Sequence, residues 1–125
     1  MRKLTHSLCL LISFAFASVS IGWSNDFKKH SDAQKNSACA LKEWKILAEQ
    51  GNPMAQYNLG RLYYLGQGVA ESLVYAYVWA NYASSNGFEM GEELAWIIAE
   101  LMTPSQVEEA QQLANKCLGK NYKGC

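Results

Sequence analysis

Side chains that could perform acid–base or nucleophilic chemistry are few in this chain of 125 residues. It has two histidines, and only His30 lies beyond the apolar N-terminal run, in a polar segment. A Ser–His–Asp triad or a Cys–His pair needs an imidazole that a packed scaffold holds in place, whereas a histidine in a polar segment is solvated. We therefore predict that the protein is not an enzyme and has no catalytic residues.

Metal and phosphate sites are not indicated either. The cysteines include no C-x-x-C pair, which is the spacing typical of zinc sites. The segment Gly66-Gln67-Gly68 lacks the Lys and the Ser or Thr of a phosphate-binding loop. Glu89, Glu92 and Glu93 are best explained as the first turn of a helix, where negative charge complements the helix dipole. We expect no metal and no cofactor.

Charge and composition exclude further classes of protein. Eleven basic residues balance eleven acidic ones, so no net field attracts a polyanion and nucleic acid is not an expected partner. Half of the residues are apolar and only two are prolines, which excludes a disordered chain. The length is suited to one domain.

The first 24 residues are typical of a secretory signal peptide. After Arg2 and Lys3 no charged residue occurs until Asp26, and the apolar run ends in small residues, Ala15-Phe16-Ala17. The alternative is a retained membrane anchor, but a span needs ~20 strongly apolar residues and this stretch thins into serines. We predict export to the periplasm or the medium, no membrane span after cleavage, and a flexible polar lead-in over 25–38.

The rest of the chain predicts helices and no strands. Apolar residues recur at the helical period, and the breaks carry helix-end signals. Gly51-Asn52-Pro53 is suited to ending one helix and starting the next, and Thr103-Pro104-Ser105-Gln106 is suited to a capping box. We predict five helices, over residues 39–50, 53–65, 71–85, 88–102 and 104–117.

These helices repeat with a period near 35 residues. Trp44 recurs as Trp79 and Ala48 recurs as Ala83, each 35 positions later. Two helices per period are typical of an α-solenoid, in which each helix pair buries its apolar face only by stacking on its neighbours. The sequence therefore predicts an all-α fold, a short α-solenoid of antiparallel helix pairs with about five helices, over residues 39–117.

One unit, over residues 52–87, resembles a Sel-1-like repeat, a relative of the tetratricopeptide repeat. The resemblance rests on Ala55-Gln56-Tyr57-Asn58-Leu59-Gly60, Tyr63, Gly66-Gln67-Gly68-Val69, Ala76, Trp79, Ala83 and Gly87. It implies an adaptor or scaffold that binds another protein or peptide. A glycine inside a helix costs ~1 kcal/mol relative to alanine, so we expect Gly60 to let a partner helix approach closely.

The resemblance also implies where a ligand binds, because first-helix positions line the concave face of tetratricopeptide repeats. The matching stripe consists of Met54, Tyr57, Arg61 and Tyr64, and an offset of 36 continues it, more weakly, as Met90, Glu93, Ile97 and Glu100. Our candidate binding residues are Met54, Tyr57, Arg61, Tyr64, Glu93 and Ile97. The alternative is an ordinary solvated face that carries amphipathic tyrosines.

Three cysteines remain once the signal peptide is removed: Cys39, Cys117 and Cys125. We predict a Cys117–Cys125 disulfide that closes a tail over 118–125, with Gly119 ending the helix in a left-handed conformation and Gly124 turning the chain back. Cysteine-rich members of the Sel-1-like family pair cysteines at the same separation. The third thiol would then stay free or pair between chains. Pairings that use this thiol, and three free thiols, are the alternatives.

A second function is also implied by the resemblance, since cysteine-rich Sel-1-like proteins are sometimes described as cell-wall or β-lactam hydrolases. A hydrolase needs a nucleophile and a base, and no histidine is available here as the base. We therefore expect an exported interaction module without catalysis, and keep the hydrolase as the alternative.

Overall fold

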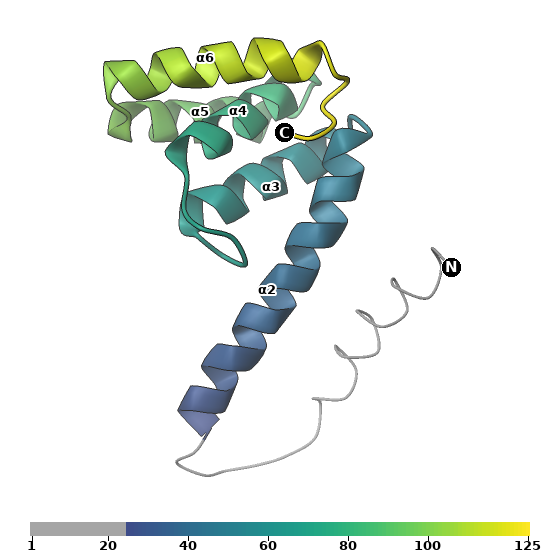
Figure 1. Cartoon of the computed structure of the whole chain (residues 1–125), viewed down its shortest axis with the longest axis vertical. Coiled ribbons are helices and arrows are strands. Elements are labelled where there is room, and N and C mark those ends of the chain that lie inside the picture. Colours follow the sequence, from purple (N-terminus) through teal and green to yellow (C-terminus); the bar gives the residue numbers. More distant parts are fainter. Residues whose placement is uncertain (1–24) are drawn as a thin grey trace.

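The computed structural model describes residues 25–125, with side chains from Asn36 onward, and this part of the chain is all-α (Figure 1). Its five helices are α2 (Asn25–Glu49), α3 (Pro53–Leu65), α4 (Leu73–Ser85), α5 (Glu89–Leu101) and α6 (Pro104–Leu118). Neighbouring helices pack on one another, which confirms the predicted all-α fold of stacked helices. The predicted signal peptide lies outside the described residues.

Helix α4 is the centre of the fold because it packs against α3, α5 and α6. Its Trp79 and Val78 are fully buried in one apolar cluster, with residues from α2, α3, α6 and the C-terminal tail. A second cluster lies between α4 and α5 and contains Ala80, Leu94 and Ile98. A helix that is apolar on several sides is buried between its neighbours, and this explains the central place of α4.

The helix ends form as the sequence predicts. The side chain of Asn52 accepts a hydrogen bond from the Ala55 amide at 3.0 Å, with Pro53 in the first turn. At the start of α6, Thr103 and Gln106 form a reciprocal capping box. These interactions involve only residues three apart, so they can be predicted from the sequence without knowledge of the fold.

The first described helix differs from our prediction. We expected a flexible lead-in over 25–38 and a helix over 39–50, whereas α2 already begins at Asn25. The prediction of a flexible lead-in rested on the polar composition of the segment. No glycine or proline occurs between Asn25 and Gln50, however, so nothing in the sequence interrupts the helix.

Two glycines lie where helices cross. A Cβ atom added at Gly60 would lie 3.1 Å from the Ala76 carbonyl oxygen of α4, which confirms the predicted close approach. The crossing at Gly91 is tighter, since a Cβ there would lie 2.7 Å from both the Ala80 oxygen and the Ser84 nitrogen. Both crossings involve Ala80, so α3 and α5 are each joined through a glycine to adjoining positions of α4. We did not predict the role of Gly91.

The C-terminal tail is closed by the predicted disulfide between Cys117 and Cys125, whose Cα atoms lie 5.9 Å apart. Gly124 has a positive φ of 74°. Gly119 is right-handed, with φ −63°, so our prediction of a left-handed Gly119 is wrong. The helical turn continues past Gly119, since the Lys120 amide donates to the Cys117 carbonyl oxygen at 3.0 Å and the Asn121 amide donates to the Leu118 carbonyl oxygen at 3.1 Å.

The left-handed positions of the tail are instead Asn121 and Tyr122, with φ of 54° and 66°. For the third thiol we expected either a free state or a pairing between chains. Cys39 is disulfide-bonded, and none of the cysteines among the described residues is free.

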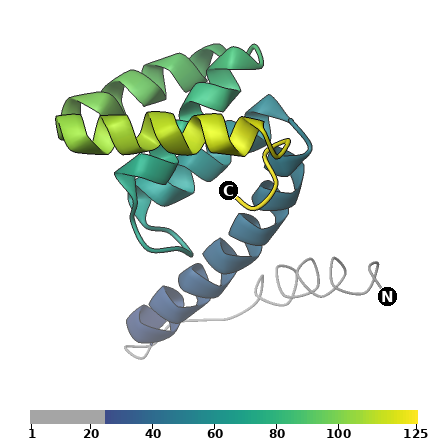
Figure 2. The ribbon, with the colours of Figure 1, turned by 45° about the horizontal axis from the view of Figure 1, so that its top comes forward.

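The tail folds back from the end of α6 toward the junction of α2 and α3 (Figure 2). The Tyr122 ring packs edge-on against Tyr82, with 4.9 Å between their centroids. The Asn86 amide group donates to the Gln56 side chain at 2.8 Å and lies 3.3 Å from the Tyr122 hydroxyl. Gln56 is fully buried and donates to the Ala48 carbonyl oxygen. These polar contacts tie the tail to the first helix pair.

Tyr82 gives the fold a testable pH dependence. Its hydroxyl donates to the Ala114 carbonyl oxygen at 2.5 Å, and burial together with the neighbouring Tyr122 raises the pKa of Tyr82 to about 12. A phenol in an unfolded chain has a pKa near 10, so above that pH the folded state retains its proton more strongly. The stability from this group is therefore complete below pH ~10 and is lost as the pH rises toward ~12. Urea denaturation across this pH range should show the decline in the free energy of unfolding.

The Tyr82→Phe variant is the control, because it keeps every other ionisable group of the chain. It is expected to be less stable at neutral pH by about 1 kcal/mol, from the lost hydrogen bond. Its stability should also fall less steeply at alkaline pH. If the free energy of unfolding fell equally steeply with pH in the wild type and in the variant, the role of Tyr82 would be contradicted.

Candidate functional site

Exposed apolar side chains gather on α3 and α5. Among the described residues, the large apolar side chains that are exposed on these two helices are Met54 and Leu65 on α3, with Met90, Trp96, Ile97 and Leu101 on α5. Trp96 is 66% exposed and Leu101 is 56% exposed. Exposed apolar side chains gathered on two neighbouring helices make this surface a candidate interaction site. We call these six residues the α3–α5 face.

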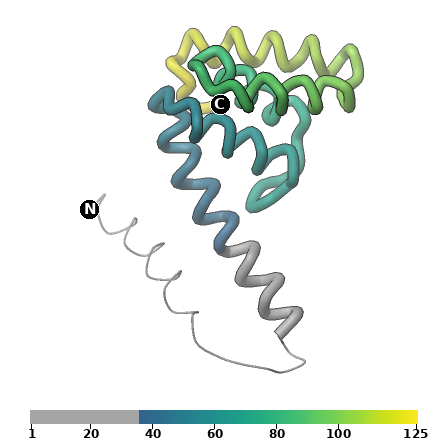
Figure 3. The backbone as a smooth tube through the Cα atoms, turned by 180° about the vertical axis from the view of Figure 1, so that it is seen from behind, coloured from purple at the N-terminus to yellow at the C-terminus, as the bar shows by residue number. Residues whose placement is uncertain are grey.

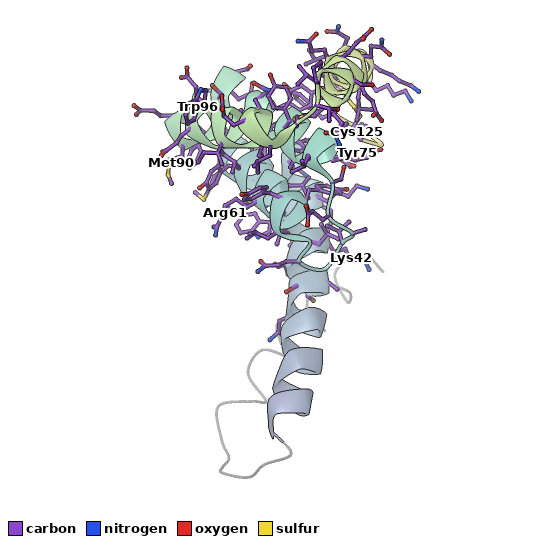
Figure 4. The ribbon with its side chains drawn as sticks, turned by 90° about the vertical axis from the view of Figure 1, so that its left-hand side faces the viewer. Lys42, Arg61, Tyr75, Met90, Trp96 and Cys125 are labelled. Atoms are coloured by element: carbon purple, nitrogen blue, oxygen red, sulfur yellow. A yellow bond between two sulfur atoms is a disulfide. The ribbon has the colours of Figure 1, made fainter. Side chains whose placement is uncertain are left out.

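The α3–α5 face lies on one side of the molecule. Seen from behind, α5 is nearest to the viewer, above α3 (Figure 3). Figure 4 shows Arg61, Met90 and Trp96 on the same side, while Lys42 and Cys125 lie on the other. The two helices are therefore positioned by α4, which holds both through the glycine crossings, so that their outer sides point the same way.

The stripe that we predicted on α3 divides into exposed and half-buried members. Met54 and Arg61 are exposed, whereas Tyr57 and Tyr64 are half-buried and pack against the cluster between α4 and α5. Helical geometry accounts for this. Met54 and Arg61 are seven residues apart and lie almost in line along α3, and the two tyrosines form a second such line about 60° away, because they follow Met54 and Arg61 by three residues. The stripe therefore runs along the edge of the core and is only partly solvated.

Tyr57 connects the two helices of the face. Its ring contacts the ring of Phe88, the residue before α5, with 5.1 Å between centroids. The guanidinium carbon of Arg61 lies 5.9 Å from the centroid of the same ring. A cation over an aromatic face is attracted by the ring quadrupole, which favours one orientation of the Arg61 side chain.

On α5 the predicted residues Glu93 and Ile97 are both exposed. An open hollow lies at the start of this helix and is lined by Glu89, Met90, Glu92 and Glu93. Within the described residues, the structure places no three His, Cys, Asp or Glu side chains close enough to hold a metal ion.

Sequence reasoning missed three residues of the face: Leu65, Trp96 and Leu101. The offset of 36 that relates Met54 to Met90 also relates Leu65 to Leu101, so the repeat carried this signal. The same offset places Trp96 where the first unit has Gly60. The second unit therefore has a large side chain where the first has a glycine, and α6 packs on α4. Trp96 itself is exposed.

Comparisons with known proteins add no identification, since no protein-family model and no curated protein matches this chain. In the part of the chain that the structure describes, no helix combines the length and apolar character needed to span a bilayer.

Proposed function

We propose that this protein is an exported Sel-1-like repeat module that binds another protein or a peptide and acts as an adaptor or scaffold without catalysis. The observation that carries the proposal is the α3–α5 face. Two helices related by the repeat present exposed apolar side chains at equivalent positions, Met54 with Met90 and Leu65 with Leu101. Small soluble domains seldom leave such a row uncovered without a partner.

The types of side chain beside this row also support binding. Arg61, Tyr57 and Trp96 belong to the three residue types that are most enriched at binding hot spots. Tyr57 is held between Phe88 and Arg61, so it loses little side-chain entropy when a ligand orders it. A short face of two helices favours a ligand of peptide size and modest affinity.

The experiment that tests this proposal is selection of a displayed random peptide library on the purified chain. Peptides selected on the wild-type chain should bind the Met54→Ala/Arg61→Ala variant at least about tenfold more weakly, since removal of anchors at an interface costs more than ~1 kcal/mol each. Both residues are exposed, so the helical circular dichroism should not change.

Lys42→Ala is the matched control, because Lys42 is exposed on the opposite side of the molecule (Figure 4). It should leave the binding of the selected peptides unchanged. Failure to select any peptide, or peptides that bind both variants as well as the wild type, would contradict the proposed role of the α3–α5 face.

A further inference from the structure

The outer side of α5 carries negative charge that no neighbouring cation neutralises. The helix has four exposed carboxylates and neither lysine nor arginine: Glu89, Glu92, Glu93 and Glu100. None of the four forms an ion pair with another residue in the described part of the chain. The first turn of α5 is a favourable place for Glu89 and Glu92, but Glu100 lies near the other end, where the helix dipole disfavours it. The dipole therefore does not account for the whole set.

The carboxylates and the apolar side chains interleave around α5. Residues of an α-helix follow one another at about 100°, so Met90, Ile97 and Leu101 fall on one line along the axis. We measure angles about the helix axis from this line, all in one direction. Glu93 and Glu100 lie at about 60–80°, Glu89 lies slightly further round, and Trp96 lies at about 120°. An acidic stripe thus runs between an aliphatic ridge and an exposed indole.

We infer that the outer side of α5 binds a cationic amphipathic segment of the partner, one in which Lys or Arg side chains lie between apolar ones. This inference rests on the proposed function and names the chemistry of its ligand. Apolar side chains of such a segment would cover Trp96 and the ridge of Met90, Ile97 and Leu101. Its cations would meet the acidic stripe, which has no counter-charge of its own.

The same charges argue against a second copy of this chain as the occupant. An isologous contact would bring the outer sides of two α5 helices together and oppose two sets of four carboxylates. Like charges across an interface are costly, and Arg61 is the only basic residue on α3 or α5 to offset them. An anionic surface, such as an acidic lipid bilayer, is disfavoured for the same reason.

Fluorescence anisotropy with three labelled synthetic peptides tests the inference. The probes are amphipathic helical peptides of equal length built from Leu and Lys, from Leu and Gln, and from Leu and Glu. We expect the Leu–Lys peptide to bind the purified chain about tenfold more tightly than the Leu–Gln peptide, and the Leu–Glu peptide to bind least. The preference for Lys should shrink as NaCl is raised, because salt screens exposed charges.

The variant Glu89→Gln/Glu93→Gln/Glu100→Gln should lose the preference for the Leu–Lys peptide while retaining the affinity for the Leu–Gln peptide. The matched control is Glu108→Gln/Glu109→Gln, which removes exposed carboxylates from α6 and should preserve the preference. Trp96→Ala should weaken the binding of both the Leu–Lys and the Leu–Gln peptides.

Three results would overturn the inference. These are equal binding of the Leu–Lys and Leu–Gln peptides by the wild type, no binding of the Leu–Lys peptide, and a preference that persists in the α5 variant. The displayed-library selection separates this failure from failure of the proposed function. If the selected peptides need Met54 and Arg61 for binding and yet are uncharged or acidic, the α3–α5 face does bind peptides, and only the inference of a cationic ligand is wrong.

Discussion

Replacement of Gly91 by alanine is expected to lower the free energy of unfolding by about 2 kcal/mol, the middle of the range for overpacked sites. The added methyl group would lie 2.7 Å from the Ala80 oxygen and the Ser84 nitrogen, and 2.9 Å from the Ala83 Cβ. Two of these atoms belong to the backbone of α4, so no side-chain rotation relieves the clash. Helix α5 has to move away from α4, which opens the cluster around Leu94.

Gly60→Ala is the matched comparison, because it places the same methyl group at the other glycine crossing of α4. Its closest contacts would be 3.1 and 3.2 Å, which a shift of a few tenths of an ångström relieves. Alanine also gains ~1 kcal/mol in helix propensity over glycine at both positions. We therefore expect Gly60→Ala to change stability by less than about 1 kcal/mol, within the range of that propensity gain.

Urea denaturation followed by circular dichroism measures both variants. Two results would show that α5 is not held tightly against α4: an equal loss of stability in the two variants, or a more stable Gly91→Ala. Gly91→Leu is expected to be worse than Gly91→Ala, since more methylene groups are forced into the same crossing.

Loss of the Cys117–Cys125 disulfide is expected to cost ~2–3 kcal/mol in the chain-entropy model, which corresponds to a decrease in Tm of roughly 10–20 °C for a domain of this size. The bond closes a short loop, and it also holds Tyr122 against Tyr82 and beside Asn86. Without the bond, the tail would have to order itself to make these contacts.

The variant to measure is Cys117→Ala/Cys125→Ala, because Cys117 is fully buried and serine would add an unpaired hydroxyl. It should be compared with the wild type without a reductant, since Cys39 is also disulfide-bonded. Lys123→Ala, an exposed change within the closed loop, is the control and should leave the Tm nearly unchanged. A double variant that melts with the wild type would show that the tail packs equally well without its bond.

Features that depend on nearby residues were predictable from the sequence. The caps at Asn52 and Thr103 follow from contacts three residues apart, and the crossing at Gly60 follows from the cost of a glycine inside a helix. The Cys117–Cys125 pair is likewise local in sequence. Each of these predictions used a short segment and a known energetic preference.

Features that depend on the packing of distant segments were not predictable in the same way. Gly119 is right-handed because the tail continues the turn of α6 before folding back onto Tyr82 and Asn86, contacts that no local pattern encodes. The exposure of Trp96 depends on which helices cover α5, and no local pattern encodes this. The role of Gly91 was missed because the second unit does not repeat the glycine pattern of the first.

The central position of α4 also bears on how the chain folds. Most of its packing joins helices that follow one another directly, so the loops closed on assembly are short and their entropic cost is small. Topologies dominated by such local contacts cross their folding barrier quickly. The contacts of Tyr82 with Ala114 and Tyr122 join segments that are far apart in the sequence, and they require α6 to be in place first. We therefore expect α3, α4 and α5 to assemble first and the tail to dock onto them last.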